Sequence, residues 1–207
     1  LLLTPISARA DLRVAQTNHY RIHTDLEYGL ADDLARRMDA MYDEYAKRLS
    51  IFGDQHTGKT FDVYLFARRD DYLKFTHNAL EHSGGVTIPG VNIVAAFLDD
   101  QGRDALRRTL QHEAFHQFAH SLINKSMPPW LDEGLAVMFQ EGIWTGQSFL
   151  LGQVSERRVR LLQSDIANHR LIDFDKMLAL SLHDWNATFN ADRAKGGTQY
   201  NQAWAMC

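Results

Sequence analysis

The chain has 207 residues, of which 45% are hydrophobic and 23% charged, a balance typical of globular proteins. Its 22 basic and 26 acidic residues give a formal net charge of −4, without any basic block, which argues against nucleic acid or an anionic membrane surface as a partner. The single cysteine, Cys207, excludes an internal disulfide, and no apolar run reaches the ~18 residues of a membrane span.

Each end of the sequence predicts a feature of the longer protein. The chain starts with three leucines and no initiating Met, and Ala8-Arg9-Ala10 resembles the A-x-A cleavage site of a secretory signal. We expect residues 1–10 to be a signal-peptide remnant and the protein to be extracytoplasmic, either periplasmic or secreted. The alternative is an arbitrary start in an apolar segment. An apolar helical pattern runs to the last residue, so we expect a truncated C-terminus.

The first half of the chain mixes predicted helices and strands. Residues 28–50 carry apolar side chains at helical spacing, whereas residues 61–67 are rich in β-branched and aromatic residues. The segment 86–97 is also β-rich, but Pro89 and Gly90 interrupt it, which predicts an edge hairpin or a bulged edge strand. Two further elements are a strand at 19–24 and a helix at about 69–80.

A phosphate-loop pattern lies between the first two of these elements. Gly53 to Thr60 reads G-x-x-x-x-G-K-T, the letters of a nucleotide-binding loop. Such a loop needs a strand before it and a helix after it, so that main-chain amides meet the phosphate. Here the order is reversed, and we interpret the segment as a plain connection from a helix to a strand.

The second half of the chain is predicted to be mostly helical. A helix at 103–123 is apolar on more than one side, as expected of a central helix, and Pro128-Pro129 suit the start of the next one. The remaining predictions are a hairpin in GIWTGQSFLLG, helices at 155–169 and 174–182, a loop over HDWNATFNADRAKGG and a last helix starting in QYNQAWAMC.

The central helix carries the motif HEAFH, formed by His112, Glu113 and His116. Two histidines four residues apart lie on one face of a helix. Zinc in catalytic sites takes three nitrogen or oxygen ligands and leaves one position for water. His112 and His116 supply two ligands, and Glu133 on the next helix is the natural third. Glu113 is placed to accept a proton from the metal-bound water.

Two other ligand sets fit less well. His120 follows His116 by four residues, but it would sit about 6 Å further along the helix axis and could not close a tetrahedral site with both others. The pattern HExxHxxGxxH needs Gly at 119 and His at 122, where this chain has Ala119 and Leu122. Asp132 is either a hydrogen-bond partner of a ligand histidine or an N-terminal helix charge.

HEAFH followed by PPWLDEGLA resembles the gluzincin clan of zinc peptidases, and in particular the peptidase-MA-like domains, which include bacterial families of unknown function. The resemblance is strongest at 109–141. It implies that Glu133 is the third zinc ligand. It also suggests Tyr200 in YNQAWAMC as the hydroxyl that steadies the oxyanion, with Gly196-Gly197 giving the preceding loop freedom. The alternative for Tyr200 is a half-buried aromatic at a helix start.

The sequence also departs from the clan. Thermolysin-type relatives carry an Asp four residues after the ligand Glu, where this chain has Val137. Aminopeptidase members carry a G-x-M-E-N signature before HExxH, and GGVTIPGVNIVAAF lacks its acid, which argues against a plain aminopeptidase. An edge strand near Val86–Val94 can still bind an extended peptide or protein substrate by strand addition.

The expected fold is α+β and zincin-like. We expect one catalytic domain over 11–207, with a small mixed β-sheet lobe over 11–102, a mostly helical lobe over 103–207 and HExxH on the central helix. The expected reaction is zinc-dependent hydrolysis of peptide bonds with Glu113 as general base. The alternatives are a non-catalytic zinc-containing binding domain or a zinc hydrolase of a non-peptide substrate.

Overall fold

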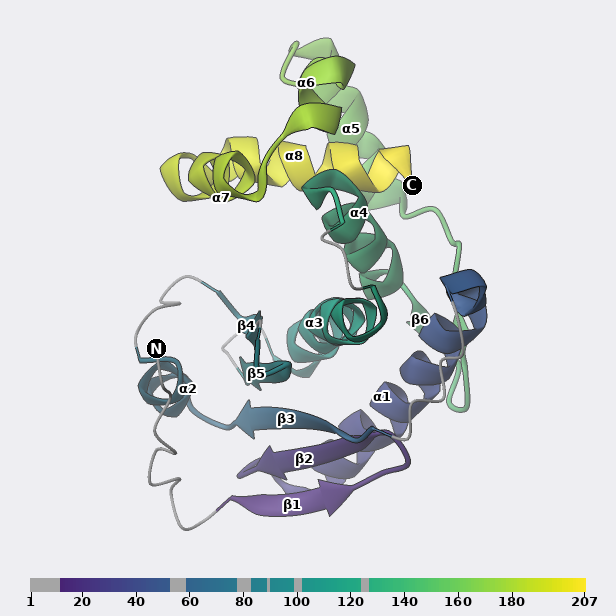
Figure 1. Ribbon diagram of the computed structural model, residues 1–207, viewed down its shortest axis with the longest axis vertical. Coiled ribbons are helices and arrows are strands. Elements are labelled where there is room, and N and C mark those ends of the chain that lie inside the picture. Colours follow the sequence, from purple (N-terminus) through teal and green to yellow (C-terminus); the bar gives the residue numbers. More distant parts are fainter. Residues whose placement is uncertain (1–11, 53–58, 78–82, 89, 99–101, 124–126) are drawn as a thin grey trace. The chain divides into compact units, whose positions relative to one another are not determined.

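The computed structural model describes residues 12–52, 59–77, 83–88, 90–98, 102–123 and 127–207 (Figure 1). These residues form a mixed α+β structure, as predicted. The chain divides into two compact units, the first comprising residues up to Leu122 together with Trp144–Phe149, and the second comprising Ile123–Ile143 and Leu150–Cys207. The HEAFH helix belongs to the unit that contains the sheet.

The first unit is built on a five-stranded mixed sheet of order β1-β2-β3-β5-β4. The central strands β2, β3 and β5 are parallel, and β1 and β4 pair antiparallel at the two edges. The strand β4 therefore forms a hairpin with β5 and lies at an edge, which confirms the predicted edge hairpin. The bounds are β1 Arg13–Gln16, β2 Tyr20–Thr24, β3 Phe61–Phe66, β4 Gly85–Ile88 and β5 Ile93–Phe97.

Two long helices, α1 (Tyr28–Arg48) and α3 (Arg103–Leu122), pack against each other and against the sheet (Figure 1). Tyr45 of α1 is fully buried, contacts the rings of Phe115 and Phe118, and donates a hydrogen bond of 2.6 Å to the carbonyl oxygen of Gln111. The periodic apolar residues of both helices therefore form one core, and that core fixes the rotation of α3 about its axis.

The opposite face of the sheet is partly covered by α2 (Arg69–Phe75). Successive strand residues point to opposite faces, so Tyr64 and Phe66 of β3 face α2, where both contact the ring of Phe75. Tyr72 of α2 packs on Phe97 of β5 in the same cluster. The helix ends earlier than the predicted 80, and residues 78–82, with His82, lie outside the described part. The short 3-10 helix η1 (Ser50–Phe52) follows α1.

The second unit is helical and is held together by α8 (Arg193–Met206), which packs against α4, α5 and α7. Its core is formed by Met177, Trp185 and Ala203. The predicted hairpin is confirmed as β6 (Ile143–Trp144) and β7 (Phe149–Leu150), which span the division between the units. The other bounds are α4 Pro129–Gln140, α5 Glu156–Ala167, α6 Phe174–Ala179 and α7 Leu182–Ala191.

The predicted loop over 183–197 is wrong, because this segment forms α7 and the first turn of α8. Each helix starts at a side-chain cap: Ser181 accepts a hydrogen bond from the main-chain N–H of Asp184, and Asp192 accepts from Ala194 and Lys195. Gly196 and Gly197 consequently lie inside α8 and give no loop freedom before Tyr200.

Two sequence predictions fall on residues outside the described part. The signal remnant at 1–10 is one, and most of the Gly53–Thr60 segment is the other. The elements on either side of that segment, α1 and β3, do occur in the order of a helix followed by a strand. No helix in the described ranges combines the length and the hydropathy of a membrane-spanning segment.

Candidate metal centre

His112 and His116 lie one turn apart on α3 and present the same ring nitrogen to one point. Their Nε2 atoms are 3.2 Å apart, and the ring planes cross at 77°. His116 is buried and His112 half-buried. Because Phe115 and Phe118 pack against Tyr45 of α1 and anchor α3, the two imidazoles occupy a defined position in the unit.

The distance between these nitrogens can be compared with a zinc site. Two ligand nitrogens at ~2.05 Å from a tetrahedral ion lie about 3.3 Å from each other. The observed separation of 3.2 Å fits this value. It also fits a hydrogen bond between one protonated and one unprotonated ring nitrogen, so the geometry is compatible with a metal and with a direct His–His bond.

Glu113 is held on the side of α3 that faces the edge strand. The hydroxyl of Thr87 in β4 lies 2.9 Å from Glu113 Oε2 and 2.7 Å from the carbonyl oxygen of Glu113. The carboxylate therefore has a hydrogen-bond donor from the strand proposed to bind substrate. Thr87 was missed in the sequence, because a single threonine in a strand carries no pattern that relates it to a helix 26 residues away.

An aromatic side chain lies near this carboxylate. Tyr72 is fully buried beside Phe97. Burial raises the pKa of its hydroxyl to about 12, and the negative charge of Glu113 adds to the increase. Tyr72 is therefore neutral at physiological pH, and it brings no second negative charge to the surroundings of Glu113.

His120 continues the histidine series on α3. Its ring centroid lies 5.7 Å from that of His116, and the side chain is exposed. This position, one turn further along the helix, is the one anticipated from the sequence. Asp132 and Glu133 belong to α4 in the second unit.

Glu133 is half-buried on α4, and its neighbour Gly134 contacts α8. A Cβ atom at Gly134 would come within 2.6 Å of the carbonyl oxygen of Ala203, so a glycine is required where the two helices meet. Tyr200 precedes Ala203 by almost one helical turn. Within the second unit, Glu133 and Tyr200 are thus carried by the same tightly packed helix pair.

Tyr200 lies in the middle of α8 and not at its start. Its ring makes edge-on contacts with Trp185 at 5.4 Å and with Phe189 at 5.8 Å, between ring centroids. The side chain is half-buried, so part of it reaches the surface of the unit. These contacts fix the ring and are equally suited to a structural aromatic and to a positioned hydroxyl.

The second half of the chain matches a protein family. Residues 107–207 match the family described as "Protein of unknown function (DUF1570)". The matched segment contains all five candidate residues, namely His112, Glu113, His116, Glu133 and Tyr200. No curated protein matches the sequence.

Proposed function

We propose that this protein is a zinc-dependent peptidase of the gluzincin type. The observation that carries the proposal is the separation of 3.2 Å between the Nε2 atoms of His112 and His116 on α3. Glu113 directly follows His112 in the chain. A pair of structural histidines does not need a carboxylate at this position, whereas hydrolysis needs a general base there.

The metal would be held by His112, His116 and Glu133. The histidine separation fits two nitrogens on one tetrahedral zinc ion. The resemblance of PPWLDEGLA to the gluzincins is the reason for choosing Glu133 as the third ligand. When bound, zinc supplies a Lewis acid that polarises the substrate carbonyl and lowers the pKa of its water toward ~7.

Glu113 and Tyr200 would carry out the proton transfer and the stabilisation of the oxyanion. Glu113 takes the proton of the attacking water and passes it to the leaving amine. Tyr200 donates a hydrogen bond to the oxyanion that forms on the substrate carbonyl. The edge-on contacts with Trp185 and Phe189 would hold the Tyr200 ring in one orientation during this step.

The substrate would be an extended peptide or protein segment that adds to the edge strand β4. Edge strands present unpaired main-chain groups to which a peptide can bind. The segment Gly84–Phe97 contains no acidic residue, so it offers no carboxylate to a free peptide N-terminus. We therefore favour binding along the strand over recognition of a terminus.

The test is hydrolysis of a quenched fluorescent peptide library by the purified chain, before and after zinc removal with a chelator. The proposal predicts cleavage that disappears on chelation and returns with added zinc. A zinc-loaded chain that cleaves neither the peptides nor simple esters and amides would instead be a non-catalytic zinc domain. Cleavage of esters or amides alone would make it a hydrolase of a non-peptide substrate.

A further inference from the structure

The strand β4 runs along the helix α3 with matched spacing. A Cβ atom at Gly85 would meet Thr109 Cγ2 at 2.5 Å, so the absence of a side chain at Gly85 lets the strand approach the helix closely. Two residues further along the strand, Thr87 contacts Glu113, four residues further along the helix. Two residues along a strand and four residues along a helix both advance about 6 to 7 Å. The contact of Gly85 with Thr109 and that of Thr87 with Glu113 therefore have the same spacing on both elements.

The hydroxyl of Thr87 has a single proton and two acceptors on the same residue. These are the carbonyl oxygen of Glu113 at 2.7 Å and Glu113 Oε2 at 2.9 Å. Thr87 is 9% exposed, so little water competes for the bond. A donor placed between the main chain and the side chain of one residue restricts how that side chain can rotate.

The main-chain groups of Thr87 are directed toward the open edge of the sheet. Gly84 accepts a main-chain hydrogen bond from Phe97 of β5. Because pairing alternates along antiparallel strands, Val86 and Ile88 also direct their main-chain groups toward β5. The N–H and C=O groups of Thr87 then point away from β5, toward the side where an added strand would bind.

We propose that Thr87 is the positioning residue that orients the Glu113 carboxylate and links it to the strand that receives the substrate. This role adds a positioning residue to the proposed peptidase site, and its effect on catalysis rests on the proposed function. A peptide paired with the main chain of Thr87 would lie beside a carboxylate oriented by the same residue. The arrangement sets the position of the base relative to the bound strand.

The first test needs no turnover. Crystal structures of the parent chain, Thr87→Val and Thr87→Ser would be compared at the Glu113 side chain. We expect the carboxylate to leave its position in Thr87→Val, with β4 and α3 unchanged, and to return to it in Thr87→Ser, which keeps the hydroxyl. An unmoved carboxylate in Thr87→Val overturns the inference. Should Thr87→Val be unstable, Thr87→Ala removes the same donor with a smaller side chain.

The second test uses the hydrolysis assay. Thr87→Val should lower kcat by about 10- to 100-fold, the range expected for losing a hydrogen bond to a charged group, with little change in KM or zinc content. Thr87→Ser should restore kcat. The matched control is Thr76→Val, which removes another buried threonine hydroxyl, one that donates to the Tyr72 carbonyl oxygen at 3.0 Å.

The outcomes separate this inference from the proposed function. Equal losses in Thr87→Val, Thr87→Ser and Thr76→Val would show a general effect on folding and overturn the positioning role. An unchanged kcat in Thr87→Val would do the same. If the parent chain cleaves nothing, the proposed function fails, and the crystallographic comparison still decides whether Thr87 orients Glu113.

Discussion

The hydroxyl of Thr87 and the carboxylate of Glu113 are joined at 2.9 Å across the contact between β4 and α3. The two residues come from a strand and a helix of the same unit, and both elements are fixed by the core beneath them. This bond connects the edge of the sheet to the residue that we propose as the general base.

The role of Glu113 is tested by Glu113→Gln, which keeps the size of the side chain and removes its basicity. We expect zinc content to stay at the parental value and turnover to fall by roughly 10²- to 10⁴-fold, the usual contribution of a general base. Peptide hydrolysis and elemental analysis on the same samples measure both quantities. Parental activity in the variant would rule out Glu113 as the base.

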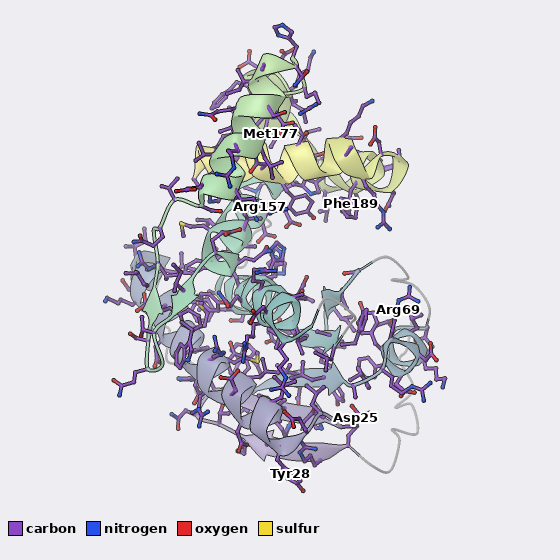
Figure 2. All side chains as sticks on the ribbon, turned by 180° about the vertical axis from the view of Figure 1, so that it is seen from behind. Asp25, Tyr28, Arg69, Arg157, Met177 and Phe189 are labelled. Carbon is purple, nitrogen blue, oxygen red and sulfur yellow. The ribbon has the colours of Figure 1, made fainter. Side chains whose placement is uncertain are left out.

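The role of Tyr200 is tested by Tyr200→Phe, which keeps the ring contacts with Trp185 and Phe189 and removes the hydroxyl. We expect kcat to fall by about tenfold or more, with the melting temperature and the zinc content retained. The control is Tyr28→Phe, because Tyr28 is 75% exposed on α1 (Figure 2). Unchanged turnover in Tyr200→Phe would leave Tyr200 as a packing residue.

Two adjacent glycines of α8 should respond in opposite ways to alanine. A Cβ atom at Gly196 would lie 2.6 Å from Phe189 Cδ2 and 3.0 Å from Phe189 Cα, whereas nothing lies within 4 Å of one at Gly197 (Phe189 is labelled in Figure 2). Gly196→Ala should cost about 1 to 3 kcal/mol through overpacking. Gly197→Ala should stabilise α8 by about 0.5 to 1 kcal/mol.

Urea unfolding of both glycine variants measures these changes in the free energy of unfolding. Equal effects of the two substitutions would contradict the packing of α7 on α8 at this point. The pair is informative because the two glycines share one helix and one chemical change, so only the neighbouring side chain differs.

The contact between α1 and α3 should depend on pH through Asp33. Although burial opposes the shift, hydrogen bonds from Arg37 and Arg107 lower the pKa of the Asp33 carboxyl. A group whose folded pKa is lowered contributes stability above its unfolded pKa of about 3.9, and this contribution is lost as the pH falls through the folded value.

The substitution Asp33→Asn should therefore cost about 1 to 2 kcal/mol at pH ~7 and much less at the acidic end, below pH ~3. Unfolding by urea across this pH range provides the measurement. Asp173→Asn is the control, because Asp173 also pairs with a cation, Lys176, but is 73% exposed and screened by solvent. A pH-independent cost for Asp33→Asn would contradict the assignment.

The sequence predicted those features that depend on local periodicity. The apolar spacing of residues 28–50 predicts α1, and the proline and glycine of the segment 86–97 predict an edge strand, which is β4. The helix that carries His112 and His116 was predicted within one residue of its observed end, Leu122. Helix geometry alone then places the two histidines on one face.

Features that depend on contacts distant in sequence were not predicted. The sequence predicts a loop over 183–197, because polar residues and two glycines hide the helical pattern. Its glycine at 196 is explained by the approach of Phe189, which only the packed structure shows. The hydrogen bond between Thr87 and Glu113 could not be predicted either, since it depends on how β4 lies along α3.

The central claim is that His112, His116 and Glu133 hold one zinc ion, and elemental analysis of purified protein tests it most directly. We expect one zinc per chain in the parent and in Glu156→Ala, where the substituted side chain is 89% exposed on α5. Glu133→Ala and His112→Ala should lose the metal while remaining folded. Parental zinc content in Glu133→Ala, or a parent that binds no zinc, would contradict the account.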